Sequence, residues 1–381
     1  MQDAVIVEAL RSPMGRKNGS LRETRPDDLL ADVINALLGR TGLDPRHIDD
    51  LLVGCVTQTG EQGLNVGRLA GLISDLPVEV PAASLNRMCG SGLQALNWAA
   101  QGIMSGIHDV IIAAGTESMS RVPIGSDGGA LSQRVTAKYD MVHQGISAEM
   151  IAEKWHLSRE ELDAFSYESH MKAVKGQKEG AFEREIVPVK GITKGGEEFL
   201  FARDETPRPA TTREKLASLP PAFKEGGLIT AGNSSQITDG AAALLVMSGE
   251  KAKRLGLKPR ARFLTCALAG VDPTIMLTGP IPATQKVLLK ASLKVQDIDI
   301  FEINEAFAPV VLAWMKELAP EPAKVNPLGG AIALGHPLGC TGVRLVTTLL
   351  HELEDTGRRL GLVSMCIGWG LGIATLIERL P

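Results

Sequence analysis

An internal repeat constrains this chain more than any other feature of its sequence, because a duplicated sequence predicts two similar halves. The segment at 48–53 resembles the segment at 298–303, a shift of 250 residues. At the same shift, the glycine-framed segment at 89–92 matches the segment at 339–342, and each precedes a predicted helix followed by an apolar strand. Short apolar segments also recur by chance in any protein that alternates strands and helices. Several matches in the same order favour a true duplication.

A further match predicts that the first half is interrupted. The apolar segment at 240–247 resembles the segment at 370–377, but the shift here is 130 residues. The two shifts differ by 120 residues, so we expect an insertion of about that length in the first half, spanning roughly 116–236. This stretch is rich in proline and glycine pairs and contains one predicted helix, which starts at a capping box formed by Ser158 and Glu161.

The order of strands and helices predicts a layered α/β fold. Strands that alternate with helices favour a mostly parallel, buried sheet in each half. Two such halves are expected to pack as a five-layer α/β/α/β/α body, with the insertion lying across one end. The length of 381 residues fits this division. We predict an N-terminal half made of 1–118 and 237–256, an inserted loop domain at 119–236, and a C-terminal half at 257–381.

Composition argues against several classes of function. A net charge of -4 and an aromatic content of 4% argue against a surface for nucleic acid. The five cysteines include no CxxC pair and none at zinc spacing, which is typical of a reduced, intracellular protein. The N-terminus is acidic where a signal peptide needs basic residues, and the longest uncharged stretch, 88–107, is too polar for a membrane span. We therefore expect a cytoplasmic protein.

Cys89 lies in a glycine-framed turn directly before a predicted buried helix at 93–107. At a helix N-terminus, free N–H groups and the positive end of the helix dipole favour the thiolate, which is the nucleophilic form. Gly90 and Gly92 allow backbone N–H groups to approach a substrate oxygen, as an oxyanion hole requires. The alternative interpretation is a core cysteine in a tight turn.

His336 lies in a loop that holds five glycines between 326 and 342. A neutral imidazole in such a loop could accept a thiol proton or donate a hydrogen bond to an enolate oxygen. The alternative interpretation is a capping or buried structural histidine.

Two further polar side chains lie where predicted strands end, which is where open α/β sheets bind ligands. Cys366 follows an uncharged strand, and Asn304 ends the strand at 298–303. The Asn304 amide suits the orientation of a water molecule, although a plain helix N-cap explains it equally well. The glycine-rich turn after Cys366 is a poor dinucleotide loop, because a strand follows it. The remaining cysteines are interpreted as packing residues: Cys55, Cys266 and Cys340.

Taken together, these motifs resemble the thiolase family. Cys-Gly-Ser-Gly at 89, Asn-Glu-Ala-Phe-Ala at 304, Gly-Gly-Ala-Ile-Ala-Leu-Gly-His-Pro at 329 and Cys-Ile-Gly at 366 occur in the order of that family. The resemblance covers nearly the whole chain and implies a duplicated fold with an inserted loop domain. Several segments are similar to degradative 3-ketoacyl-CoA thiolases, the acetyl-CoA C-acyltransferases of fatty acid β-oxidation.

The resemblance implies an acyl transfer in two steps, with coenzyme A as a substrate and with no metal or redox cofactor. Cys89, activated by His336, would attack the 3-keto carbonyl of a 3-ketoacyl-CoA and form an acyl-enzyme. Acetyl-CoA would leave as an enolate held by His336 and by a water on Asn304, while Cys366 supplies the proton. Cys366 would then deprotonate the incoming CoA. The N–H groups of Cys89 and Gly368 would form an oxyanion hole for its attack.

The same resemblance assigns contacts with the CoA thioester and predicts the assembly. Gln144 and Trp369 depart from the common pattern of the family, which affects the acyl pocket. The stretch at 121–150 is shorter than its tetramer-forming counterpart in acetoacetyl-CoA thiolases, so we predict a homodimer. Binding of a hydratase and dehydrogenase partner stays open. The residues expected to contact substrate are Ser235, Arg208, His143, Phe223 and Phe307.

Alternatives remain open at this point. The chain could be an acetoacetyl-CoA thiolase (acetyl-CoA acetyltransferase) that works in condensation, or a relative that binds CoA or a partner without catalysis. A condensing ketoacyl synthase is also conceivable, but those enzymes use a second histidine where this chain has Asn304. Cys89 and Cys366 could oxidise to an inactivating disulfide if they lie close together.

Overall fold

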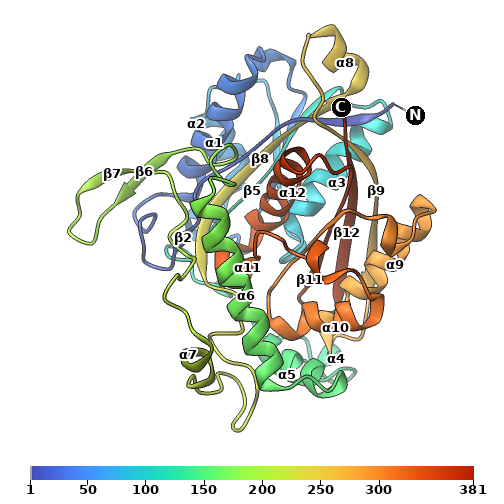
Figure 1. The fold of residues 1–381 in the computed structure, drawn as a ribbon. Helices are drawn as coiled ribbons and strands as arrows, with labels where there is room; N and C mark the ends of the chain where they lie inside the picture. The colour runs from blue at the N-terminus through green and yellow to red at the C-terminus, as the bar shows by residue number, and fades with distance from the viewer. Residues whose placement is uncertain (1) are drawn as a thin grey trace.

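The computed structural model describes residues 2–381 and consists of two α/β halves with a long inserted segment (Figure 1). The strands are β1 (Ala4–Arg11), β2 (Gly15–Arg16), β3 (Asp50–Gly54), β4 (Ala82–Leu85), β5 (Val110–Ser118), β6 (Val189–Ile192), β7 (Glu198–Phe201), β8 (Thr238–Ser248), β9 (Ala261–Gly270), β10 (Ile300–Ile303), β11 (Leu360–Ile367) and β12 (Leu371–Arg379). The helices are α1 (Pro26–Thr41), α2 (Val66–Ile73), α3 (Ser91–Met104), α4 (Gln133–Thr136), α5 (Gln144–Lys154), α6 (Arg159–Lys178), α7 (Arg213–Ala217), α8 (Gly249–Arg254), α9 (Pro280–Ala291), α10 (Ala308–Leu318), α11 (Ala331–Leu334) and α12 (Leu338–Asp355).

The N-terminal half is built on strands in the order β4-β3-β5-β8-β1. The helices α1 and α2 cover one face of these strands, because their apolar side chains share a core with the residues that the strands present on that face. The helix α1 starts with Pro26, whose fixed φ suits the first helical position, and ends at Gly42 with a left-handed φ of 63°. The opposite face of the strands packs against α3.

The C-terminal half repeats this arrangement with strands in the order β9-β12-β11-β10. Its outer face packs against α9 and α10, and its inner face packs against α12. The two sets of strands meet at β1 and β9, which pair at Val5–Arg262 and Ile6–Ala261. Because α3 and α12 share one core with strands of both halves, the layers follow the predicted order α/β/α/β/α. Figure 1 shows both helices at the centre of the molecule.

The expectation of mostly parallel strands is wrong. Parallel pairs join β3 to β4 and β5, and β10 to β11, whereas β8 runs antiparallel to both β1 and β5. β12 likewise runs antiparallel to β9 and β11. A continuous apolar run indicates that both faces of a strand are buried. In this fold helices cover both faces of parallel and antiparallel strands alike. The sequence pattern therefore indicated burial and could not determine direction.

The duplication is confirmed by the order of elements. In each half, a helix (α1 or α9) leads to a short strand (β3 or β10), and a central helix (α3 or α12) leads to a long buried strand (β5 or β11). An antiparallel partner closes each half, β8 against β5 and β12 against β11. The repeated segments of the sequence lie at these equivalent positions.

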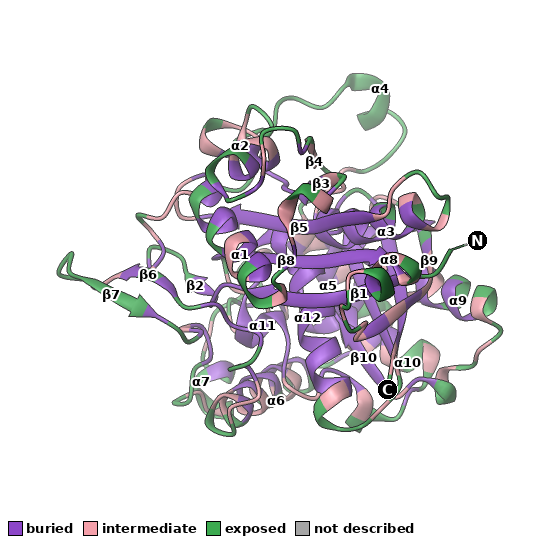
Figure 2. Cartoon of the chain, turned by 90° about the horizontal axis from the view of Figure 1, so that it is seen from above, coloured by how far each residue is buried: buried purple, intermediate pink, exposed green. Residues whose placement is uncertain are grey.

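The inserted segment lies between β5 and β8 and carries α4 to α7 with the hairpin β6–β7. The predicted capping box is present at the start of α6, where Ser158 and Glu161 exchange hydrogen bonds with each other's backbone. Figure 2 shows the tip of the β6–β7 hairpin and the loop around α4 as exposed stretches that extend from the buried strands. The domain limits stated above remain a prediction.

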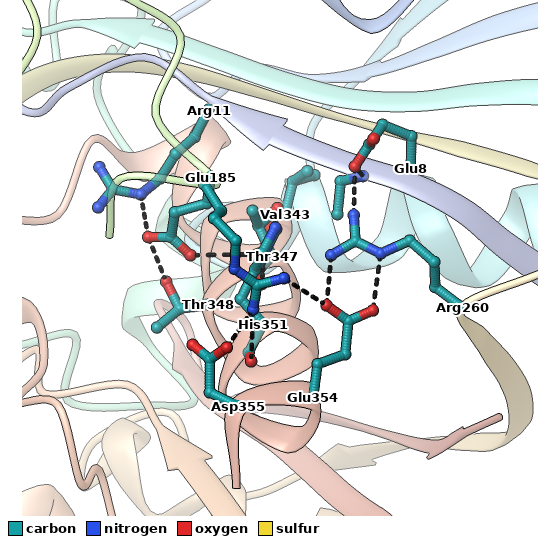
Figure 3. Close-up of polar contacts among 12 residues, drawn as sticks. Glu8, Arg11, Glu185, Arg260, Val343, Thr347, Thr348, His351, Glu354 and Asp355 are labelled. Atoms are coloured by element: carbon teal, nitrogen blue, oxygen red, sulfur yellow. Dashed lines mark hydrogen bonds and ion pairs between the residues drawn. The ribbon is translucent and has the colours of Figure 1, made fainter. Parts of the chain in front are cut away.

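A buried group of ion pairs fastens the inserted segment to both halves (Figure 3). The side chain of Arg11 on β1 has no exposed surface, and it bonds Glu185 at 2.6 Å and Asp204 at 2.7 Å. Glu185 also accepts a hydrogen bond of 3.1 Å from the hydroxyl of Thr348 on α12. Breaking such a buried group leaves an uncompensated charge, so we expect this anchor to hold the insertion firmly over the site.

Within the described residues, none of the helices combines the length and the apolar character needed to span a membrane.

Candidate active site

The two central helices approach each other at glycines, and this contact brings the two halves of the site together. A Cβ atom added to Gly92 in α3 would lie 2.5 Å from the carbonyl oxygen of Gly339 in α12, and one added to Gly342 would overlap the backbone of Leu93. Only glycine permits backbones to approach so closely. The turn before α3 carries Cys89, and the loop before α12 carries His336.

Cys89 lies in the turn that leads into α3 and is 5% exposed. Burial raises its pKa to about 11, although N–H groups of Gly368 and of Cys89 itself oppose this shift. Loss of water on burial therefore outweighs the effect of the helix terminus, which favours the thiolate. Cys89 is a neutral thiol that needs a base, and two backbone N–H groups are directed at its sulfur.

The loop between α11 and α12 holds His336 in one tautomer. The hydroxyl of Thr341 donates to the carbonyl of Pro337 at 2.8 Å, so its oxygen can only accept from Nδ1 of His336, which lies 2.7 Å away. Nδ1 therefore carries the proton, and Nε2 presents a lone pair. Burial, followed by the charge of Arg344, lowers the pKa of His336 to about 3. The imidazole is neutral and is able to accept a proton at Nε2.

Asn304 lies next to His336, directly after β10. Its Nδ2 atom is 3.4 Å from Nε2 of His336, and its backbone N–H donates to Ser364 on β11 at 2.9 Å. The N-cap interpretation is wrong, because α10 begins at Ala308 with Phe307 as its N-cap residue. The Oδ1 atom of Asn304 is buried and has no hydrogen-bond partner among the described residues. A buried acceptor of this kind can hold a water or a substrate group.

Cys366 lies near the end of β11, as predicted, and is 1% exposed. Burial raises its pKa above the usual range, and the negative charge that Cys89 can carry raises this pKa further. The segments around them also touch, since a Cβ atom added to Gly90 would lie 2.5 Å from Cδ1 of Ile367. Both cysteines are free thiols.

A cavity of about 840 Å³ opens beside these residues. His336, Gly368 and Leu338 line it, and Leu338 belongs to the same apolar cluster as Cys89. Its other walls are mainly apolar, as expected of a ligand pocket. The apolar and aromatic lining residues include Met88, Met119, Ile124, Val142, Phe223, Met276, Phe307 and Trp369.

All five residues expected to contact substrate line this cavity. His143 stacks on Phe223 with ring centroids 5.2 Å apart, and Phe223 meets Phe307 edge-on at 5.9 Å. The guanidinium of Arg208 donates to Gln236 at 3.1 Å. Ser235 donates its backbone N–H to Ala306, next to Phe307, at 2.9 Å. The cavity thus has an aromatic wall, formed by His143, Phe223 and Phe307, and polar residues that line it as well.

Two buried glutamates that support the site were missed in the sequence. Glu117 on β5 accepts backbone hydrogen bonds from Val56, Thr57 and Gly339, all at 2.9 to 3.0 Å. It therefore ties the strand ends of the first half to the start of α12. The signal was present, since a carboxylate inside the apolar strand at 110–118 must be satisfied by partners that lie elsewhere in the chain.

Glu305, in the motif that follows β10, is the second of these glutamates. Its carboxylate accepts hydrogen bonds from Asn326 at 2.9 Å, from the backbone of Ile332 at 3.1 Å and from Ser169 on α6 at 2.6 Å. The histidine loop is therefore fixed to β10 and to the inserted segment. The sequence analysis considered only Asn304 of this motif.

The other cysteines serve packing. Cys55 and Cys340 are fully buried, and Cys340 belongs to the core shared by both halves. Burial raises the pKa of Cys340 to about 12. Cys266 on β9 is partly buried and accepts a hydrogen bond from Gln101 at 3.4 Å. None of the three is among the residues that line the cavity, and neither Cys89 nor Cys366 is among them.

Comparison with known proteins gives matches along the whole chain. Residues 4–250 match the family model described as thiolase, N-terminal domain, and residues 257–379 match the one described as thiolase, C-terminal domain. A 3-ketoacyl-CoA thiolase of Bacillus subtilis is 46% identical, covering 99% of this chain and 100% of its own. A steroid 3-ketoacyl-CoA thiolase of Mycobacterium tuberculosis is also 46% identical, over 100% of this chain and 95% of its own.

A solved structure matches equally completely. The crystal structure of the Bacillus anthracis acetyl-CoA acetyltransferase superposes with a TM-score of 0.92 and 40% sequence identity, covering 100% of this chain and 99% of its own.

Proposed function

The chain belongs to the thiolase family, and from this membership we propose that it cleaves 3-ketoacyl-CoA with CoA to give acetyl-CoA and a shortened acyl-CoA. It is an acyltransferase that acts on CoA thioesters. The observation that carries the proposal is the fixed tautomer of His336, which leaves Nε2 unprotonated on a residue that lines the cavity together with Gly368 and with Met88, the chain neighbour of Cys89. We assign the reaction to Cys89, His336, Asn304 and Cys366.

In the first step, Nε2 of His336 takes the proton of Cys89, and the sulfur attacks the 3-keto carbon of the substrate. The bond between C2 and C3 then breaks, which leaves the acyl group on Cys89 and an enolate of acetyl-CoA. The new N–H at Nε2 and a water held by Asn304 stabilise the enolate oxygen. Cys366 donates its thiol proton to C2, and acetyl-CoA departs.

In the second step, the Cys366 thiolate takes the proton of the incoming CoA thiol. The CoA thiolate attacks the acyl carbon, and the carbonyl oxygen lies against the N–H groups of Cys89 and Gly368. The Cys89 thiolate leaves and regains its proton from His336. All protons are returned, so the cycle requires neither a metal nor a redox cofactor, and CoA is only a substrate.

The rest of the cavity supplies binding. The aromatic wall of His143, Phe223 and Phe307 suits the apolar parts of pantetheine, and Ser235 and Arg208 offer polar contacts along it. Binding energy from these distant parts holds the reacting carbonyl near Cys89.

Assembly and location remain predictions. We propose a homodimer, because β4 is the outermost strand and the neighbouring segment exposes large apolar side chains. These are Leu64, Leu72, Ile73 and Val78. Light scattering that returns a monomer mass would contradict the dimer. The cysteine usage favours the cytoplasm, and a hydratase and dehydrogenase partner stays an open prediction.

Thiolysis of a 3-ketoacyl-CoA series from acetoacetyl-CoA to long chains, with free CoA, tests the proposal. Formation of acetyl-CoA together with the matching shortened acyl-CoA supports it. Cleavage of acetoacetyl-CoA alone would instead favour the alternative, an acetoacetyl-CoA thiolase that works in condensation. The similar solved structure of Bacillus anthracis is named as an acetyl-CoA acetyltransferase. No cleavage of any member would reject both and leave a non-catalytic CoA-binding relative.

A further inference from the structure

The turn between β11 and β12 contains a large residue in an unfavourable conformation. Ile367 pairs with Leu371, so Gly368, Trp369 and Gly370 form the turn. Trp369 has a φ of 65° and Gly370 has a φ of 80°. The left-handed region suits glycine and costs a bulky side chain about 1–2 kcal/mol. Backbone strain of this kind persists at functional sites, where the surrounding structure holds it in place.

The position of this turn connects the strain to the cavity. Trp369 lines the cavity, and 44% of its surface is exposed. The preceding residue is Gly368, which also lines the cavity and whose N–H group opposes the rise in the pKa of the Cys89 thiol. The indole therefore follows directly in the chain a residue of the expected reaction centre, it lines the cavity, and nearly half of its surface is exposed.

Two other side chains complete this end of the cavity. A Cβ atom added to Gly368 would lie 3.1 Å from Nε2 of Gln144 and 3.4 Å from Cε of Met88, so both side chains cover the backbone of Gly368. The channel lined by Ser235 and Arg208 is the part assigned above to CoA. Trp369 and Met88 line the same cavity and do not belong to the part assigned to CoA.

We propose that Trp369 is a specificity-determining residue that provides an apolar wall for the acyl chain and favours 3-ketoacyl-CoAs with chains longer than that of acetoacetyl-CoA. This inference rests on the proposed function. Acyl carbons beyond the first cover indole surface that is otherwise wet, and each buried methylene stabilises the complex. Acetoacetyl-CoA is too short to gain from this surface.

The variant Trp369→Gly tests the proposal without straining the turn, because glycine accepts a φ of 65°. We expect kcat/KM for 3-ketodecanoyl-CoA to fall about tenfold or more, while kcat/KM for acetoacetyl-CoA changes less than about twofold. The melting temperature should stay equal or rise, since strain is released. Trp369→Phe retains an apolar ring and should stay close to wild type with both substrates.

The matched control is Trp98→Ala in α3, because Trp98 has the same exposed fraction of 44% and does not line the cavity. It should leave the ratio of the two kcat/KM values unchanged. An increase with the long substrate in Trp369→Gly would mean that the indole blocks the chain, and equal losses with both substrates would mean that it only shapes the turn. Either result overturns the proposal.

A binding measurement separates this inference from the proposed reaction. Decanoyl-CoA, a shortened acyl-CoA product that carries the acyl chain but has no bond between C2 and C3 that the enzyme can cleave, is titrated into wild type and Trp369→Phe while tryptophan fluorescence is followed. The proposal predicts a fluorescence change in wild type that is largely lost in the variant, whatever the turnover. Equal changes in the two proteins would contradict contact between Trp369 and the acyl chain. Absence of turnover in wild type would instead contradict the proposed function.

Discussion

The two halves of the molecule share a scaffold but place different residues at equivalent positions. A shift of 250 residues aligns Cys89, before α3, with Gly339 in the first turn of α12. In the first half this position carries a thiol beside the cavity. In the second half it must be glycine, because a Cβ atom there would lie 2.5 Å from the carbonyl of Gly54. In the proposed mechanism one half supplies the nucleophile, and the other supplies the space that lets the helices meet.

The strand ends show the same difference with the roles reversed. Cys366 on β11 aligns with Thr116 on β5, and Asn304 after β10 aligns with Gly54 on β3. Thr116 donates its hydroxyl to the carbonyl of Pro26 at 3.0 Å, which is a structural contact. The two halves therefore share the places where strands and helices end but carry different side chains there, and in the proposed mechanism each half supplies a different part of one site.

The largest expected effect is a difference in kcat between variants of two buried cysteines, Cys89 and Cys340, which lie at the starts of the central helices. Cys89→Ala should lower kcat by about 10⁴-fold or more, because no acyl-enzyme forms. Cys340→Ala removes a thiol from the core of α12 and should leave kcat within about threefold while costing about 1 kcal/mol of stability. Steady-state thiolysis and thermal melts check both variants. Comparable losses of kcat in the two would contradict the assignment of Cys89.

The second comparison concerns the aligned strand ends. Cys366→Ala should lower kcat by about 10² to 10⁴-fold, because the proton donor for C2 is lost. Thr116→Val, at the equivalent position, removes one hydrogen bond and should cost about 1 kcal/mol in denaturant unfolding with kcat unchanged. If Cys366→Ala retained full activity in both directions, Cys366 would be only a packing residue.

Sequence patterns predicted the layers, because these depend on local features. The catalytic candidates were chosen from the same kind of local evidence and stay a prediction. Buried strands are continuous apolar runs, and glycines flank Cys89 and His336 directly in the chain. Strand direction was not accessible, since burial on both faces looks the same in either direction. The neutral thiol of Cys89 was also missed, because its burial depends on residues such as Leu338 and Met119 from distant segments.

The contacts that support the site could not be predicted from the sequence, because they join residues whose closeness depends on the folded structure. Thr341 lies five residues after His336, but its role depends on the turn that points its hydroxyl at Nδ1. Glu117 and Glu305 join segments that are far apart in the chain. The sequence around these two glutamates could have indicated that they are buried, but it could not have identified their partners.

A smaller effect is expected at Thr341, which positions His336. Thr341→Val keeps the shape but removes the acceptor for Nδ1–H, so kcat should fall about 10 to 100-fold with little change in KM. Thr341→Ser restores the hydroxyl and should recover most of the activity. A loss in both variants, or a change confined to KM, would show that the hydroxyl does not act through His336. The aligned residue of the first half, Ser91, bonds Met88 instead and provides no tautomer control.

The smallest effect is on stability at low pH. The pKa of His336 is lowered by burial to about 3, so the unfolded chain, with a histidine pKa near 6.5, binds more protons below pH 6.5. The contribution of neutral His336 to the free energy of unfolding is therefore complete above pH 6.5, and it is lost as the pH falls from 6.5 towards 3. The slope of the unfolding free energy against pH reports how many more protons the unfolded chain binds than the folded one. In His336→Asn this difference should be smaller by up to one proton. An unchanged slope between pH 4 and 6.5 would place His336 in contact with water.

The unequal division of labour between the two cysteines is tested most directly by locating the acyl group. The protein is mixed with a 3-ketoacyl-CoA in the absence of free CoA, quenched in acid, digested and analysed by mass spectrometry. The account predicts one acyl group on the peptide that contains Cys89 and none on the peptide that contains Cys366. An acyl group on Cys366, or on neither cysteine while acetyl-CoA is released, would contradict it.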